Sequence, residues 1–431
     1  MIGKRICLVA GCLVCLVATN TWGQSARDEI KKNMRLSASN HMAYPGPQKQ
    51  LTPAPNGLKP FYISHYGRHG SRYMNNKREY TYPYETLLRA DDAGKLTPLG
   101  KDVLRRMELI LAEADMRRGE LTPLGAQQQR EIARRMFERF PEVFEGEALV
   151  DAKSTTVIRC ILSMSNALQE LSRLNPQLRI SCDASTHDMY YMNQTDSRLW
   201  NNKMPGDSKD VYDKYCEKHD RSARLVSSLI NDTAYVNHEM NAARLNYYLF
   251  KMASNIQNME VRKKLTLYDL FDDDEIYNNW QKENTWWYMT FSFCPYNGGV
   301  QPYSQRNLLR HLIADADSCI AQEKPGVALR FGHETMVLPL ACLLGINGYD
   351  LETTDLDQLE RRGWRNYRIF PMAANIQLIF YRRHPLDEDV VVKVLLNEDE
   401  ATLPIKTDMA PYYRWSDFRE YYLKRLSEYK E

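Results

Sequence analysis

Short apolar stretches lie near both ends of the chain, and the region between them has mainly the periodicity of helices. The stretch "FYISHYG" at 61–67 combines aromatic and β-branched residues, which favour strands. The same signal recurs in "GVALRFGHE" at 326–334, "NIQLIFYRR" at 375–383 and "DVVVKVLLN" at 389–397. Four strands are therefore expected, one early and three late.

The rest of the pattern predicts an α/β fold. Residues 147–158 indicate another strand and 159–174 a helix, whereas 222–265 is mainly helical. Strands on both sides of a helical middle predict a central mixed sheet flanked by helices, with an inserted, mainly helical cap domain. The expected parts are a helical lead-in and proline-rich loop at 24–60, an α/β core at 61–170 and 286–431, and the cap insertion at 171–285.

Two similar phrases, "KLTPLG" at 95–100 and "ELTPLG" at 120–125, each precede a helical pattern. Threonine suits the position that caps a helix, and proline suits the first helical turn. Nothing beyond the phrase recurs, so we interpret the pair as two similarly capped helix starts and not as a repeat.

The first 23 residues are typical of a secretory signal peptide. Two basic residues precede an apolar run at 6–18, which is too short to span a bilayer, and small residues follow up to Gly23. The segment "VAGC" resembles a bacterial lipoprotein box, but almost no apolar run precedes it. We therefore expect export to the periplasm or the extracellular space, with a lipid anchor at Cys12 as the second choice.

Composition, charge and cysteine usage limit the partners and kinds of site that the chain is expected to have. The chain is 43% hydrophobic and 26% charged, as soluble globular proteins are. Without Lys4 and Arg5 it has 55 basic and 55 acidic residues, which gives no indication of a nucleic-acid partner or a polybasic membrane anchor. Six cysteines follow the signal segment and none forms a CxxC pair, so disulfides are permitted but a zinc or redox motif is not expected.

The segment Gly67-Arg68-His69-Gly70-Ser71-Arg72 places two guanidinium groups around one imidazole, just after the first predicted strand. Ligands of open α/β sheets gather at the C-terminal ends of strands, and a helix that started after Gly70 would add its N-terminal dipole. Arginine matches phosphate oxygens in bidentate fashion. Nearby cations also keep a histidine neutral, and a neutral imidazole can attack phosphorus. We prefer this interpretation to a surface loop that is merely basic.

Two other segments share the strand-end position. His333-Glu334-Thr335 follows the strand signal at 326, and Arg159 lies between a strand and a helix in "TTVIRCILSMSNAL". Alone, a core histidine and a surface arginine would be the ordinary interpretations. The acidic run in "FDDDEIYNNW", at 271–280, predicts a helix start more than a set of metal ligands. No metal or other cofactor is expected.

"RHGSR" with a distant "GHET" resembles the histidine phosphatase superfamily, in its acid phosphatase and phytase branch. The family pattern is a strand ending in RHGxR, an LTPLGxxQ phrase, an arginine that opens a helix, and a late His-Asp. The chain has the phrase at 121–128 and the arginine in "VIRCILSMSNAL", so the likeness runs in order over about residues 60–345. The mutase branch shares RHG but does not typically have arginine at the position of Arg72.

Within that branch the chain looks most like bacterial multiple inositol polyphosphate phosphatases. The doubled LTPLG phrase, "HDMYYMN" at 187–193 and the neutral exported chain carry this likeness. Those enzymes usually read His-Ala-Glu, and most acid phosphatases and phytases read His-Asp. Here Glu334 follows His333 directly and is one methylene longer than aspartate, which leaves the place of the proton donor and the substrate preference open. Tyr73-Met74 also stand where many relatives have proline.

The resemblance implies a two-step, metal-free hydrolysis of phosphate monoesters. His69 would attack phosphorus and become phosphohistidine, and Glu334 would protonate the leaving group and then activate water. The oxygens of the transferring group would be held by Arg68, Arg72, Arg159 and His333.

The favoured function is an exported phosphomonoester hydrolase acting on inositol polyphosphates such as phytate. One alternative is a broad acid phosphatase for sugar phosphates or nucleotides. Another is a phosphate-ester-binding protein without turnover, which only the His-Glu spacing favours. The cap would select substrates, with His187 either a substrate contact or a buried structural residue. Lys153 and Arg179 are expected on the surface. The only expected partner is the small-molecule substrate, and the oligomeric state stays open.

Overall fold

A mixed sheet forms the centre of the molecule in the computed structural model, which describes residues 24–322 and 325–430. Its strands lie in the order β3-β2-β4-β1-β5-β6-β7, and β8 pairs with β6. The first four in this order are mutually parallel, whereas β5 and the strands beyond it are antiparallel. The bounds are β1 Lys59–Arg68, β2 Leu149–Ser154, β3 Arg179–Asp183, β4 Gly326–Gly332, β5 Asn375–Arg382, β6 Val391–Leu396, β7 Asp399–Glu400 and β8 Tyr412–Arg414. The predicted mixed sheet is confirmed.

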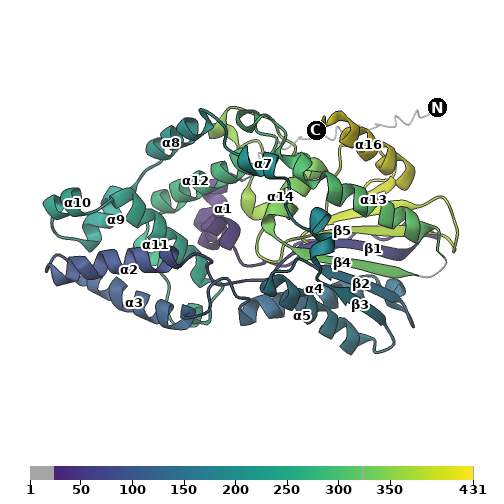
Figure 1. Ribbon diagram of the computed structural model, residues 1–431, viewed down its shortest axis with the longest axis horizontal. Helices are drawn as coiled ribbons and strands as arrows, with labels where there is room; N and C mark the ends of the chain where they lie inside the picture. Colours follow the sequence, from purple (N-terminus) through teal and green to yellow (C-terminus); the bar gives the residue numbers. More distant parts are fainter. Residues whose placement is uncertain (1–23, 323–324, 431) are drawn as a thin grey trace, which may run out of the picture.

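Helices cover both faces of the sheet and also form a separate lobe beyond one end of the strands (Figure 1). Their bounds are α1 Ala26–Lys32, α2 Lys77–Asp92, α3 Pro98–Ala114, α4 Pro123–Arg139, α5 Ile158–Leu174, α6 Met189–Met192, α7 Ser197–Asn201, α8 Ser208–Lys218, α9 Ser222–Leu229, α10 Thr233–Glu239, α11 Ala242–Ile256, α12 Asp273–Phe291, α13 Arg306–Ile320, α14 Glu334–Leu343, α15 Asn366–Ile369 and α16 Trp415–Glu428.

The sheet has an apolar core on each face, because successive side chains of a strand point to opposite sides. Ile63 of β1 packs with α4 and α5, where Ala133 and Leu168 belong to the same cluster. Tyr62, one residue earlier, belongs to the cluster formed with α12, α13, α14 and α16. Burial on both faces explains why β1 and β4 appear in the sequence as nearly continuous apolar runs.

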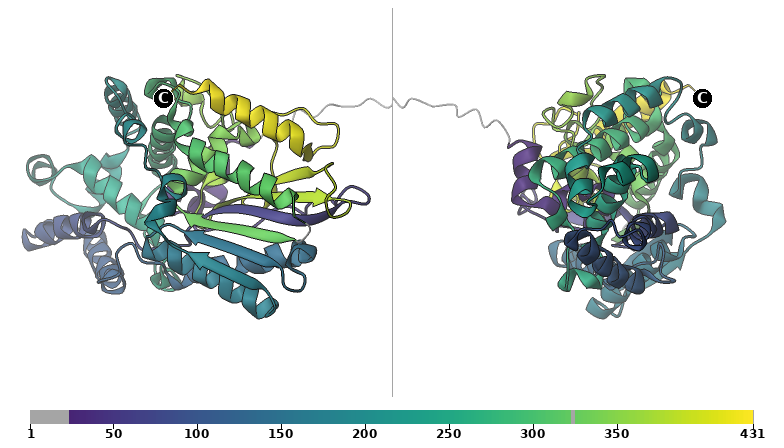
Figure 2. Two further views of the ribbon diagram at one scale, coloured as in Figure 1. Left: turned by 45° about the vertical axis from the view of Figure 1, so that its right-hand side comes forward. Right: turned by 90° about the vertical axis from the view of Figure 1, so that its left-hand side faces the viewer.

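The helical lobe has a third apolar core, built from α2, α3, α9 and α11 with the first part of α12. Figures 1 and 2 show this lobe beyond the ends of the strands, with α4 and α5 beneath the sheet. The lobe therefore draws on 77–114 as well as on the expected cap range of 171–285. Conversely β3 lies inside that range but pairs in parallel with β2, so the sheet continues past residue 170. The division into core and cap otherwise stays a prediction.

Several local predictions are confirmed. Thr97 and Thr122 cap α3 and α4, each followed by proline. The acidic run starts α12, where Asp272 and Glu275 form a capping box.

The sequence left disulfides open, and in the structure all six cysteines of the described region are free. No helix within residues 24–322 or 325–430 is long and apolar enough to cross a membrane. The predicted signal peptide and the alternative anchor at Cys12 lie outside the described residues.

A contact between two glycines joins α4 to the segment after β1. A Cβ atom on Gly70 would lie 2.3 Å from the carbonyl oxygen of Gly125, and one on Gly125 would lie 2.2 Å from the carbonyl oxygen of Ser71. Thr122 also donates hydrogen bonds from its amide and its hydroxyl to the Ser71 carbonyl oxygen, at 2.9 and 3.0 Å. The second LTPLG phrase therefore holds the RHGSR segment in place.

We predict that Gly125→Ala destabilises the protein by about 1–3 kcal/mol or more, because neither backbone can retreat from the added methyl group. Gly326→Ala is the matched control, since a Cβ atom there would meet only the Leu149 oxygen at 3.5 Å. Chemical denaturation measures both variants. Equal stability of the two would show that the glycine contact is not a constraint.

Candidate active site

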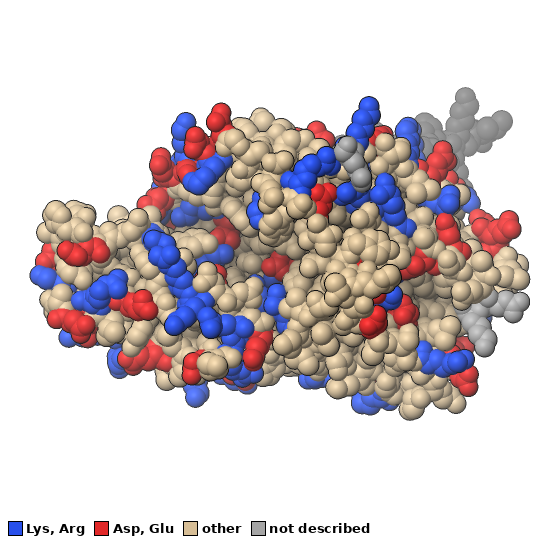
Figure 3. Space-filling model, in the orientation of Figure 1, with Lys and Arg blue, Asp and Glu red and all other residues tan. Residues whose placement is uncertain are grey.

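The pairing of two parallel strands brings the two predicted histidines together. Arg68 of β1 lies opposite Gly332 of β4, and the amide of His69 donates to the Gly332 carbonyl oxygen at 2.9 Å. His69 and His333 therefore follow paired residues, and their ring centroids are 5.6 Å apart in an edge-to-face arrangement. In Figure 3 the surface is hollowed between the helical lobe and the core, with Lys and Arg side chains beside the hollow.

His69 is held so that one of its ring nitrogens, Nε2, makes no hydrogen bond with a described residue. The ring is fully buried, and its Nδ1 lies 2.8 Å from the Gly70 carbonyl oxygen. A carbonyl can only accept, so Nδ1 carries the proton and Nε2 keeps its lone pair. Nε2 is buried and has no hydrogen-bond partner among the described residues. Burial, with Arg68 and Arg159 nearby, lowers the pKa of His69 well below its usual value. This histidine is neutral and its free nitrogen is available to attack.

Arg68 is a buried cation that the backbone fixes in place. Its two terminal nitrogens donate to the carbonyl oxygens of Phe370 and Asn40 at 2.9 and 2.8 Å, and its Nε lies 3.0 Å from Glu334 Oε2. Burial lowers the pKa of Arg68 to about 10. The guanidinium is still charged at neutral pH, and it needs an anion beside it.

Arg72 and Arg159 supply two more donors with spare capacity. Arg72 donates to the Tyr73 carbonyl oxygen at 2.9 Å, and burial lowers its pKa as well. Arg159 lies in the first turn of α5, directly after the loop that follows β2. The Nε atoms of both arginines are buried without a hydrogen-bond partner among the described residues. Buried donors of this kind normally have a partner, so their arrangement fits an anionic ligand.

Among the described residues, Glu334 supplies the only carboxylate within ion-pair distance of Arg68, His69 or Arg72. Its Oε2 lies 3.7 Å from His69 Nε2, and its Oε1 lies 4.0 Å from an Arg72 terminal nitrogen. Burial alone would raise the pKa of Glu334, but Arg68 and Arg72 outweigh it and hold the pKa well below the usual value. As the first residue of α14, the carboxylate also suits the helix dipole.

The RHGSR segment is not followed by a helix, contrary to the expectation for the chain after Gly70. Residues 69–76 are non-helical and α2 begins only at Lys77. The free amides there are taken by side chains, with Gly70 donating to Ser163 Oγ at 3.1 Å and Ser71 to Gln128 Oε1 at 2.9 Å. The helix N-termini at the site are instead those of α5 and α14, which carry Arg159 and Glu334.

Sequence reasoning missed the residues that support the site from behind. Ser163 lies one helical turn after Arg159, so the helical period could have identified it. Asn255 lies at the end of α11 and Asn258 just after it. Asn255 Nδ2 donates to the Arg72 carbonyl oxygen, and Asn258 Oδ1 accepts from the Ser71 hydroxyl. Nothing in the sequence links α11 to the RHGSR segment, because the contact arises only from packing.

The remaining candidates from the sequence are His187, Lys153 and Arg179. His187 is exposed in a short turn after β3, so the alternative of a buried structural histidine is wrong. Lys153 pairs with Asp188 at 3.1 Å. Arg179 is exposed at the start of β3, away from the strand ends that carry the site. Within the described residues no group of three or more His, Cys, Asp or Glu is arranged to hold a metal ion.

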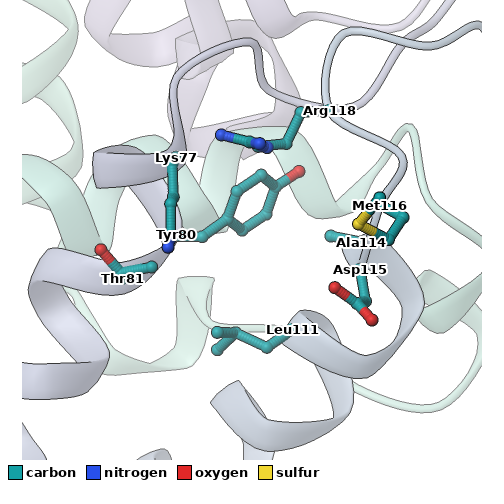
Figure 4. A pocket seen from close by; sticks show the side chains of 8 residues that line it. All are labelled: Lys77, Tyr80, Thr81, Leu111, Ala114, Asp115, Met116 and Arg118. Atoms are coloured by element: carbon teal, nitrogen blue, oxygen red, sulfur yellow. The ribbon is translucent and has the colours of Figure 1, made fainter.

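A second hollow adjoins the site. Figure 4 shows Lys77, Tyr80 and Arg118 around a cavity of about 240 Å³ between the start of α2 and the segment after α3. The Tyr80 hydroxyl accepts from the Met74 amide at 3.0 Å. Gly119, next to Arg118, would bring a Cβ atom to 3.7 Å from an Arg159 terminal nitrogen. Tyr80 and Arg118 therefore link the cavity to residues near the site, but neither the RHGSR segment nor Arg159 lines it.

Comparison with known proteins gives one family. The family model of the histidine phosphatase superfamily (branch 2) matches residues 67–397, which span both histidines and all three arginines. No curated protein sequence matches the chain.

Solved structures share the fold. A Bifidobacterium longum multiple inositol polyphosphate phosphatase, in complex with inositol hexasulfate, aligns with a TM-score of 0.73 at 17% identity, over 89% of this chain and 97% of that one. The phytase from D. castellii aligns with a TM-score of 0.67 at 14% identity, over 91% and 85%. A Hafnia alvei phytase in complex with myo-inositol hexakis sulphate gives 0.51 at 11% identity, over 88% and 98%. The expected α/β architecture is confirmed.

We predict that Glu334→Gln binds inorganic phosphate at least about tenfold more tightly than the unaltered protein at pH 7. The carboxylate lies 3.0 Å from Arg68, where it competes with an incoming anion and repels it. Loss of about 1.4 kcal/mol of repulsion corresponds to a factor of ten. Isothermal titration calorimetry measures both affinities. Weaker binding by the variant would mean that Glu334 does not oppose the anion.

Proposed function

Since the chain belongs to branch 2 of the histidine phosphatase superfamily, we propose that it hydrolyses phosphomonoesters through a phosphohistidine at His69, with inositol polyphosphates such as phytate as substrates. The observation that carries this proposal is the bare Nε2 of His69, buried among Arg68, Arg72, Arg159 and Glu334. A neutral nucleophile next to fixed cations is what attack on a phosphate dianion requires.

In the first step His69 Nε2 attacks phosphorus, and the bond from phosphorus to the ester oxygen breaks. The arginines and His333 stabilise the negative charge on the phosphoryl oxygens, so no metal is needed for this task. In the second step water attacks the phosphohistidine, which releases inorganic phosphate and returns the lone pair to Nε2.

Glu334 is the proposed acid for the leaving oxygen. In the empty site its pKa is held well below the usual value, so it lacks the proton that it must give. The substrate dianion would offset the arginines and raise the pKa of Glu334, so that the proton arrives with the substrate or from solvent. In the second step the same carboxylate accepts a proton from the attacking water.

Two lines of support favour inositol polyphosphates over simple phosphate esters. Structural relatives include a multiple inositol polyphosphate phosphatase in complex with inositol hexasulfate and two phytases. Lys77 and Arg118 also line a cavity near the site, together with one carboxylate, Asp115, and additional phosphate groups of a substrate would meet these two cations there. A broad acid phosphatase would not need these cations. We further propose export, on the signal-like segment at 1–23.

The enzyme proposal predicts that rapid quenching into alkali with ³²P-labelled substrate traps label on His69, because the phosphorus–nitrogen bond of phosphohistidine is hydrolysed in acid but survives in base. His69→Ala should abolish both the label and turnover, whereas His238→Ala, an exposed histidine on α10, should retain both. Mass spectrometry of the quenched peptide locates the phosphoryl group. Tight phosphate binding with no label under any condition would favour a binding protein without turnover.

The acid role of Glu334 predicts a dependence on the leaving group. Glu334→Gln should slow hydrolysis of phytate or glycerol phosphate by about 10²–10⁴-fold, the usual contribution of a general acid. Hydrolysis of an aryl phosphate, whose leaving group needs little protonation, should fall much less. An equal loss on both kinds of substrate would remove Glu334 from this role.

The substrate class predicts that Lys77→Ala with Arg118→Ala raises KM for phytate about threefold to tenfold, since exposed charge pairs contribute little individually. KM for an aryl phosphate should not change. The control is Lys209→Ala with Lys218→Ala on α8, which removes two exposed charges elsewhere. If phytate and the aryl phosphate respond alike, the broad acid phosphatase becomes the better description.

A further inference from the structure

The second histidine of the site, His333, has ring nitrogens in two different surroundings. Its Nδ1 is buried without a hydrogen-bond partner among the described residues. Its Nε2 lies 3.6 Å from the Cys160 sulfur atom, a distance at which a thiol can still hydrogen-bond. Cys160 follows Arg159 on α5 and is fully buried.

The placement of the proton on His333 matters because the ring is neutral. Burial lowers the pKa of His333 to about 4. The charged and titratable groups that face it are Glu334 from α14, Arg159 and Cys160 from α5, and Arg68, His69 and Arg72 from β1 and the segment after it. A neutral imidazole has one N–H. If Nε2 held it, the lone pair of Nδ1 would face the negatively charged phosphoryl oxygens.

Cys160 is able to act as a donor toward this ring. Burial raises the pKa of its thiol to about 11, so the S–H proton is retained at any pH at which the protein would act. The sulfur has two acceptors in range, His333 Nε2 and the Gly332 carbonyl oxygen at 3.3 Å. That carbonyl already accepts from the His69 amide, whereas no described residue other than Cys160 hydrogen-bonds His333 Nε2.

We propose that Cys160 is a positioning residue: its S–H donates to His333 Nε2 and thereby keeps the ring proton on Nδ1, where it can be donated to a phosphoryl oxygen. Cys160 does not touch the substrate and acts only through His333. The benefit to catalysis rests on the proposed phosphatase function, but the hydrogen bond itself is a property of the resting protein.

The direct test is the ¹⁵N spectrum of the full chain labelled at histidine, without substrate, with His333→Asn used to assign the resonance. We expect a protonated Nδ1 and an unprotonated Nε2 for His333, and loss of this preference in Cys160→Ala. Cys160→Ser retains a donor and should retain the preference. Cys294→Ala, which removes another fully buried thiol, is the matched control and should leave the spectrum of His333 unchanged.

Kinetics give a second measurement. We expect Cys160→Ala to lower kcat/KM about fivefold to tenfold at pH 6–7, the scale of one neutral hydrogen bond. The difference should shrink below pH 4, because a protonated His333 carries a proton on both nitrogens and no longer depends on Cys160. Cys160→Ser should stay within about threefold of the unaltered enzyme.

A proton on Nε2 in the unaltered protein would overturn the proposal. So would an unchanged His333 spectrum in Cys160→Ala, even if activity falls, because the loss would then come from packing. If Cys160→Ala does not fold, the spectra of the unaltered protein and of Cys160→Ser decide. If no phosphate ester is turned over, the function proposal fails while these spectra still test the hydrogen bond.

Discussion

The parallel pairing of β1 with β4 is the constraint on which the site depends. It sets Arg68 opposite Gly332, so the two segments that leave these strands start side by side although they are far apart in sequence. The amide of His69 closes the junction by donating to the Gly332 carbonyl oxygen. Next to β4, β2 leads into α5, and the first turn of that helix supplies Arg159. Three adjacent strand ends thus bring the proposed nucleophile, the cations and the proposed acid to one point, in keeping with the position of ligand sites in open α/β sheets.

The same convergence creates an electrostatic problem. Three arginines meet in a region where water is largely excluded, and an unpaired buried charge is costly. Glu334 offsets part of this charge in the empty site, at 3.0 Å from Arg68, and backbone carbonyls take two further donors of Arg68. A phosphate dianion is a better partner than one carboxylate, because it carries more charge and more acceptor oxygens. When phosphate replaces Glu334 as the partner of the arginines, Glu334 becomes free for its proposed role as the acid that protonates the leaving oxygen. Anion binding and this role are therefore linked.

Residues that act through strand ends were predictable from the sequence, because a motif beside a strand signal fixes both position and chemistry. Arg68, His69, Arg72, Arg159, His333 and Glu334 all fall in this class. The residues behind them were not. Asn255 and Asn258 reach the RHGSR segment only because α11 packs across it, and Gly125 has meaning only beside Gly70. The bounds of the lobe could not be predicted for a related reason. The helices α2 and α3 have the same amphipathic period whether they cover a sheet or pack with α9 and α11. The strand β3 is exposed and has no apolar run that would identify it in the sequence.

His69 and His333 are the same residue type in nearly the same place, so their different tasks must come from their neighbours. The Gly70 carbonyl oxygen next to His69 Nδ1 can only accept a hydrogen bond, so the ring proton lies on Nδ1 and the lone pair on Nε2. Cys160 offers His333 a donor at Nε2, and the ring can then present a proton at Nδ1. In the proposed mechanism, one histidine is the nucleophile and the other a hydrogen-bond donor, without either being charged. Burial makes this division effective, since it lowers the pKa of both rings and so prevents protonation from erasing the difference between them.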